Sequence, residues 1–141
     1  MKALAIIVLL CSCGEPIPEL EEGLYSVTLI ETGDTCNWKN NEVSYVQWWI
    51  SHIDDYYGIK MRSNGESLSC TQGAEEDNWQ ISCTKDEPQN VDNCIYQVVQ
   101  TVVIVPEGKT FEGIFDLNLQ SCTNETCFQT AVVKGELQLY Y

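Results

Sequence analysis

Basic side chains are scarce in this sequence. Seven Lys and Arg residues stand against 21 Asp and Glu among 141 residues, which gives a formal net charge of −14 at pH 7. Contacts to a nucleic-acid backbone need clustered Lys and Arg side chains that displace the counterions of the phosphates. We therefore expect no nucleic-acid partner. The same charge would repel an anionic lipid surface, so charge cannot be what holds this chain to a membrane.

Histidine is scarce, and the Cys-x-x-Cys pairs typical of zinc sites are lacking. His52 is the only histidine and no Cys-x-x-Cys pair is present, so tetrahedral zinc ligation has little support. Any Ser-His-Asp or Cys-His scheme would have to use His52. Its surroundings, Ser51 to Asp55, match no catalytic motif, which favours a surface or turn histidine. We expect no cofactor and no enzymatic activity; a hydrolase that uses His52 or a pair of carboxylates stays an alternative.

The acidic residues form no recognisable ion-binding loop. Carboxylate oxygens are the ligands that calcium prefers, and three clusters fall in expected loops, at Asp54–Asp55, Glu75–Asp77 and Asp86–Glu87. None has the ligand spacing of a calcium loop. We interpret these clusters as solvated turns and expect no metal site.

A long hydrophobic run is missing as well. The run from Ala3 to Leu10 has eight residues, and as a helix it would cover about 12 Å of a hydrocarbon core about 30 Å thick. It therefore cannot span a bilayer unaided. A basic residue, a short apolar stretch and small residues after it are typical of a secretory signal. The alternatives are a frayed hydrophobic N-terminus or a misassigned start.

The end of this run carries the most specific motif of the chain, Leu10-Cys11-Ser12-Cys13. It resembles the lipobox of bacterial lipoproteins. The resemblance implies that residues 1–12 are removed as a signal peptide, Cys11 included, and that Cys13 becomes the lipid-modified N-terminus. Two or more acyl chains hold a protein firmly to a membrane, so it also implies stable anchoring in a bacterial cell envelope. Gly14 stands where Asp often marks the inner membrane, which favours the outer membrane, with the domain facing the periplasm or the surface.

Six cysteines remain once Cys11 and Cys13 are set aside. An even number in an exported chain of this size indicates three disulfides. Six cysteines allow 15 pairings, and the sequence alone does not choose among them. Cys122 and Cys127 flank a turn-like stretch and Cys70 and Cys83 flank an acidic loop, so each pair is a candidate. Cys36 with Cys94 would then be the long bridge. The candidates are Cys36, Cys70, Cys83, Cys94, Cys122 and Cys127.

The exported chain divides into a tether and a single domain. Residues 13–23 combine the lipidated N-terminus with Pro16, Pro18 and four glutamates, a composition that resists helix and sheet. From residue 24 to residue 141 the pattern changes to alternating apolar and polar residues, which indicates half-buried strands. Tyr45–Ile53 and Ile95–Val105 are less regular, but their β-branched or aromatic content also indicates strands. The expected strands are Leu24–Leu29, Tyr45–Ile53, Tyr57–Met61, Leu68–Cys70, Trp79–Cys83, Ile95–Val105, Phe111–Leu119 and Ala131–Leu139.

These stretches predict an all-β fold. We expect about eight antiparallel strands in a meander, closed as a barrel or folded as a sandwich and stabilised by disulfides. The turns include Asp54–Asp55, a loop over Asp86–Asp92 and the turn at Pro106–Gly108. In layout alone the pattern resembles up-and-down barrels of the lipocalin or avidin kind. An integral outer-membrane barrel would also end on aromatic residues like Tyr140 and Tyr141, but the stretches near Leu68 and Trp79 are too short to span a membrane.

Aromatic residues are the best candidates for binding. Trp48 and Trp49 are adjacent in an expected strand, so they must point to opposite faces, with one ring in the core and one outside. Tyr45 and Tyr57 lie close by. Exposed aromatic rings are enriched at binding surfaces; packing of these rings within the domain is the alternative. The ligand-binding candidates are therefore Trp48, Trp49, Tyr45 and Tyr57.

The function we expect is a non-catalytic one. An envelope lipoprotein could bind a small molecule or a glycan in a pocket of the barrel. Alternatively it could act as a protein-interaction or structural lipoprotein that uses an outer face.

Overall fold

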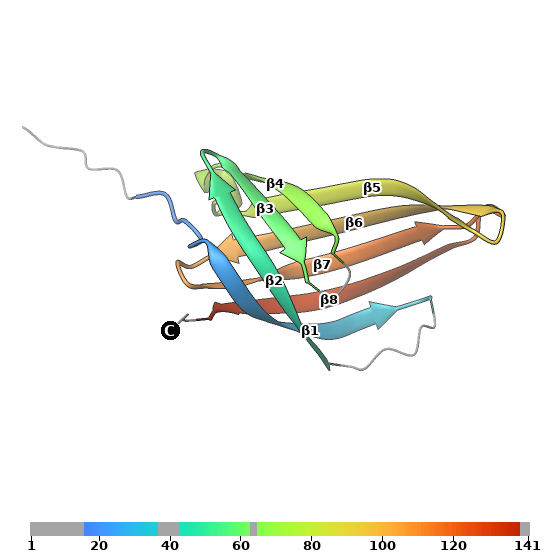
Figure 1. Cartoon of the computed structure of the whole chain (residues 1–141), viewed down its shortest axis with the longest axis horizontal. Coiled ribbons are helices and arrows are strands. Elements are labelled where there is room, and N and C mark those ends of the chain that lie inside the picture. The colour runs from blue at the N-terminus through green and yellow to red at the C-terminus, as the bar shows by residue number, and fades with distance from the viewer. Residues whose placement is uncertain (1–15, 37–42, 63–64, 139–141) are drawn as a thin grey trace, which may run out of the picture.

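Eight strands make up nearly all of the regular structure (Figure 1). The computed structural model describes residues 16–36, 43–62 and 65–138. Among these, the only helical turn is the 3-10 turn η1 at Glu75–Asp77, and no helix in them is long and apolar enough to cross a membrane. The strands are β1 (Gly23–Asp34), β2 (Val43–Ile53), β3 (Tyr56–Met61), β4 (Ser67–Gln72), β5 (Ile81–Val91), β6 (Cys94–Pro106), β7 (Thr110–Gln120) and β8 (Thr126–Leu137).

The strands close into an up-and-down barrel. Each strand pairs antiparallel with the next, and β8 returns to pair with β1 from Tyr25 opposite Leu137 to Asp34 opposite Gln129. The predicted meander of eight antiparallel strands is thus confirmed, and of the two predicted forms it is the barrel. Two-residue turns join β2 to β3 and β5 to β6. Asp54 has φ 52°, and Asp92 and Asn93 have φ 52° and 62°, the left-handed values that favour tight hairpins.

The fifth strand differs from its prediction at both ends. Trp79 lies in the turn before β5 with φ 56°, so the strand begins at Ile81. The predicted loop over Asp86–Asp92 is wrong, because β5 continues to Val91 and pairs with β6 along its whole length. It pairs with β4 only over Ile81–Cys83. Beyond that point β5 borders a single strand, where proline and exposed polar residues are tolerated, and Pro88 stands there. Figure 1 shows the β5–β6 and β7–β8 hairpins reaching past the ends of β2, β3 and β4.

The inward-facing side chains fill one half of the barrel. Trp48 and Phe111 stack with ring centroids 5.8 Å apart, and Tyr25 packs on the same Phe111 ring at 5.4 Å. Gly135 makes room for them, since a Cβ there would lie 2.2 Å from the Phe111 ring. The other fully buried side chains are aliphatic or cysteine: they include Leu20, Val27, Ile50, Ile59, Leu68, Ile81, Val102, Ile104 and Val133.

Residues 18–22 cross this filled end of the barrel, and we call them the strap. Leu20 is 1% exposed and belongs to the core. Its backbone N–H donates to the Tyr57 hydroxyl at 3.2 Å, and Gln72 Nε2 donates to the Pro18 carbonyl at 2.7 Å. The strap also forms a parallel bridge to Gly108 in the β6–β7 turn. Part of the segment assigned to the tether by composition is therefore packed against the barrel.

Three disulfides link the strands. The predicted pair Cys70–Cys83 is confirmed, because these residues face each other directly across β4 and β5. The other two predicted pairs, Cys122–Cys127 and Cys36–Cys94, are wrong. Cys127 lies opposite Leu119 while Cys122 lies in the turn, so the hairpin does not bring them together. The observed bridges are Cys36–Cys127, between the ends of β1 and β8, and Cys94–Cys122, between β6 and the β7–β8 turn.

Candidate functional site

The four aromatic candidates divide between the two faces of the barrel wall. Trp48 is 2% exposed and Trp49 is 48% exposed, so the prediction that they point to opposite faces is confirmed. Tyr57 is buried beside the strap, whereas Tyr45 is 82% exposed. The structure therefore brings Trp48 and Tyr57 into the core and leaves Tyr45 and Trp49 on the outside of β2.

The interior of the barrel is filled at one end and hollowed towards the hairpins. Its filled half contains Trp48 stacked on Phe111. Towards the hairpins a small hollow of about 90 Å³ remains, lined by side chains such as Leu29, Glu31 and Gln129. Ligand pockets are usually about 300–1,000 Å³ in size, and liquid water occupies about 30 Å³ per molecule. This hollow has room for only a few water molecules. A further hollow of about 550 Å³ lies at the hairpin end and is lined by Tyr96, Leu119 and Cys127 among others.

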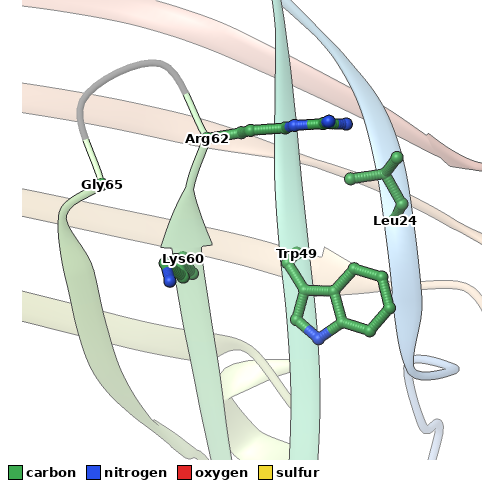
Figure 2. A pocket seen from close by; sticks show the side chains of 5 residues that line it. All are labelled: Leu24, Trp49, Lys60, Arg62 and Gly65. Atoms are coloured by element: carbon green, nitrogen blue, oxygen red, sulfur yellow. The ribbon is translucent and has the colours of Figure 1, made fainter.

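The larger hollow lies outside the barrel, on the surface of β1, β2 and β3. It measures about 840 Å³ and is lined by Leu24, Trp49, Lys60, Arg62 and Gly65. Figure 2 shows the Trp49 indole lying between β2 and β1 close to Leu24, with Arg62 reaching across β2 on one side of the ring and Lys60 on β3. A second hollow of about 490 Å³ adjoins it, shares Arg62 and is lined by Tyr45 and Gln47 among others. We call the two together the outer groove.

The register of three strands builds this surface. Leu24 on β1, Trp49 on β2 and Lys60 on β3 are direct cross-strand partners, so their side chains share one face. The alternation that sends Tyr57, Ile59 and Met61 into the core leaves Lys60 and Arg62 outside. The turn at Asp54–Asp55 folds β3 back onto β2 and so places both cations beside Trp49.

Arg62 is held in position by Gln47. The Arg62 backbone N–H donates to the Gln47 carbonyl at 3.0 Å, and its Nη1 donates to Gln47 Oε1 at 2.9 Å. One of the five guanidinium N–H donors is thereby used on a neutral acceptor. The side chain is oriented across β2 while its charge remains available to a ligand.

His52 does not form a catalytic arrangement with the residues described. It lies at the end of β2, where its ring stacks on that of Tyr57 with centroids 4.0 Å apart. Its backbone N–H donates to Glu22 Oε1 at 2.6 Å, and no described residue hydrogen-bonds to the imidazole. Within the part of the chain that the structure covers, no three His, Cys, Asp or Glu side chains are grouped so that they could hold a metal ion. The hydrolase alternative gains no support from this geometry.

Lys60 and Arg62 are the groove residues that sequence reasoning did not select. The sequence did contain a signal, because alternation turns Lys60 on β3 and Arg62 just after it outward, in a chain with only seven basic residues. Only the pairing of β3 with β2 places them beside Trp49. The lipidation candidate, Cys13, lies outside the described residues. No protein-family model, curated protein or solved structure matches this chain.

Proposed function

We propose that this protein is a lipid-anchored, non-catalytic binding protein of a bacterial cell envelope, and that the outer groove is its binding site. The main support for this proposal is the exposure and position of the Trp49 ring. This ring is about half exposed and lies in a hollow of about 840 Å³, between an aliphatic side chain and two cations. That volume is in the range of pockets for small molecules.

The chemistry of the groove favours a glycan or a similar small molecule. A large rigid aromatic surface binds the apolar face of a flat ligand at little cost in conformational entropy. Hydrogen-bonding groups border the ring: Gln47 and Arg62 on one side and Ser26 and Thr28 farther along β1. An apolar platform with polar groups at its border suits a sugar ring, which has C–H groups on its faces and hydroxyl groups at its edges.

The test is a binding screen of the folded protein against an array of immobilised saccharides. Trp49→Ala should abolish the binding of any saccharide that wild type retains, with no large loss of stability because the ring is half exposed. Tyr56→Ala is the matched control: Tyr56 is a 65% exposed ring on the neighbouring strand β3 and lines neither hollow. Equal binding by wild type and Trp49→Ala would contradict the proposal.

The lipid anchor at Cys13 is the second part of the proposal. The lipobox-like motif supports it, and the strap gives it a structural consequence. With the strap packed on the barrel from Pro18 onward, the chain from Cys13 to Pro18, five positions farther on, reaches at most about 17 Å. The filled end of the barrel would therefore stand close to the membrane, which we propose is the outer membrane. The hairpins would point away from it.

Fractionation of cells tests the anchor. Wild type should be found in the membrane fraction and be extracted by detergent. Cys13→Ala should appear in the soluble fraction, whereas Cys11→Ala, which alters a residue of the signal, should remain with the membrane. A Cys13→Ala protein that stays in the membrane fraction contradicts the anchor without affecting the groove.

A further inference from the structure

The cations of the outer groove, like Lys109 but unlike the other two described lysines, have no carboxylate partner within the part of the chain that the structure describes. Lys85 and Lys134 each pair with a carboxylate, Glu87 at 3.4 Å and Glu112 at 3.5 Å. Neither Lys60 nor Arg62 has a carboxylate within 4.0 Å among the described residues. Arg62 is also the only arginine of the sequence.

The lining of the groove is unusual for so acidic a chain. Of the described residues that line its two hollows, none is Asp or Glu, although the chain has 21 such residues. Lys60 lies on β3 and Arg62 directly follows that strand, so the two residues are about 7 Å apart along the backbone. Both side chains line the outer groove, where their like charges repel each other, and an anion bound near both would relieve the repulsion.

We infer that the ligand of the outer groove is an acidic saccharide, whose ring stacks on Trp49 while its anionic oxygens lie between Lys60 and Arg62. The inference rests on the proposed function, because it names the class of ligand for the same groove. The guanidinium of Arg62 is suited to this role, since its planar fork donates two parallel hydrogen bonds to a carboxylate, phosphate or sulfate group. Gln47 holds that fork over β2 through Nη1.

The charge of the whole molecule makes the groove selective. A protein with a net charge of −14 repels anions at long range. An acidic ligand is therefore bound only where the surface carries local positive charge, and the groove is such a place. Binding should weaken as the salt concentration rises, because the attraction of exposed charges is screened.

The experiment uses a saccharide array that presents each core sugar in neutral, carboxylated, phosphorylated and sulfated forms. Wild type should bind at least one acidic form at least tenfold more tightly than its neutral counterpart, and the forms that bind identify the anionic group. Lys60→Gln should weaken that binding about tenfold, and Arg62→Gln should weaken it more. Arg62→Lys keeps the charge but loses the fork, so its affinity should lie between those of wild type and Arg62→Gln.

Lys85→Gln is the control for loss of one positive charge, since Lys85 lies on β5 and lines neither hollow. Its binding should equal that of wild type, and thermal melting confirms that each variant is folded. If neutral sugars bind as tightly as acidic ones, and Trp49→Ala no longer binds them, this inference is overturned but the proposed function is supported. If wild type binds no saccharide on the array, both are overturned.

Discussion

At the scale of single residues, Gly135 is a position where one added methyl group should be costly. Its Cβ would lie 2.2 Å from the Phe111 ring, which is held between Trp48 and Tyr25. We expect Gly135→Ala to lower the free energy of unfolding by about 1–3 kcal/mol, the usual cost of overpacking a core. Urea denaturation of the purified protein measures this loss.

A second substitution shows whether Phe111 is the cause. Phe111→Leu removes the ring atoms that the new methyl group would meet, so Gly135→Ala combined with Phe111→Leu should cost less than the two single changes added together. Strictly additive losses would mean that the two residues are not coupled, contrary to the contact described above.

Tyr25 gives the fold a dependence on alkaline pH. Burial raises the pKa of its phenol, the nearby carboxylate of Glu21 adds to the shift, and the hydroxyl donates to the Glu21 carbonyl oxygen at 2.7 Å. Burial raises the pKa of Tyr57 too. The unfolded chain loses these protons near pH 10 while the folded protein keeps them. The stability they contribute is thus complete below pH 10 and is lost as the pH rises further.

Tyr25→Phe should remove part of this pH dependence. Each retained proton steepens the decline by up to about 1.4 kcal/mol per pH unit, so the variant should lose stability less steeply than wild type between pH 10 and 11. Near pH 7 it should be less stable by about 1 kcal/mol because a hydrogen bond is lost. The free energy of unfolding, measured in urea across this range, provides the comparison; parallel curves for the two proteins would contradict the assignment.

At the scale of elements, the strap is the segment whose role differs most from its composition. Leu20→Ala should cost about 2–5 kcal/mol, as for other large-to-small changes in cores, because Leu20 is 1% exposed. Ile17→Ala is the matched control, since Ile17 is 52% exposed just before the strap. Thermal unfolding of both variants should show a large loss for the first and almost none for the second. Similar losses would mean that the strap does not belong to the core.

The disulfide between the ends of β1 and β8 should stabilise the fold more than the disulfide between β6 and the β7–β8 turn. Cys36 and Cys127 are 91 residues apart, against 28 for Cys94 and Cys122. In the chain-entropy model these loops correspond to about 4–5 and about 3–4 kcal/mol. Replacing Cys36 and Cys127 by serine should therefore lower the urea midpoint more than replacing Cys94 and Cys122. The reverse order would show that strain or residual structure outweighs loop length.

Local patterning was enough to predict most of the strands. Alternation identified the inward faces of β1, β3, β7 and β8, and Asp54–Asp55 identified a turn. It did not identify the far half of β5, because its exposed polar residues and Pro88 have the composition of a loop. These residues are tolerated in a strand there because β4 pairs with β5 only at its start. The disulfides had the same difficulty. Cys70 and Cys83 are close in sequence and were predicted, but Cys36 meets Cys127 only because β8 returns to β1.

At the scale of the whole molecule, the sequence predicted two residues of the site, Trp49 and Tyr45, and strand pairing adds Lys60 and Arg62 to them. The opposite orientations of Trp48 and Trp49 follow from strand geometry alone. Which of the two faces the core depends on closure, because the curvature of the wall defines an inside. The pairing of β1 with β2 brings Leu24 next to Trp49, and closure fills the interior with Trp48 and Phe111. The candidate binding surface is consequently outside the barrel, where sequence patterning had suggested a pocket of the barrel.

NMR titration of the isotopically labelled protein, with a saccharide retained on the array, tests most directly whether the proposed ligand binds on the outside of the barrel wall, at Trp49. We predict that the indole N–H signal of Trp49 and the amide signals of Lys60 and Arg62 shift, while the indole signal of Trp48 stays in place. Shifts confined to Trp48 or to residues around the interior hollow such as Gln129, with Trp49 unmoved, would contradict the account.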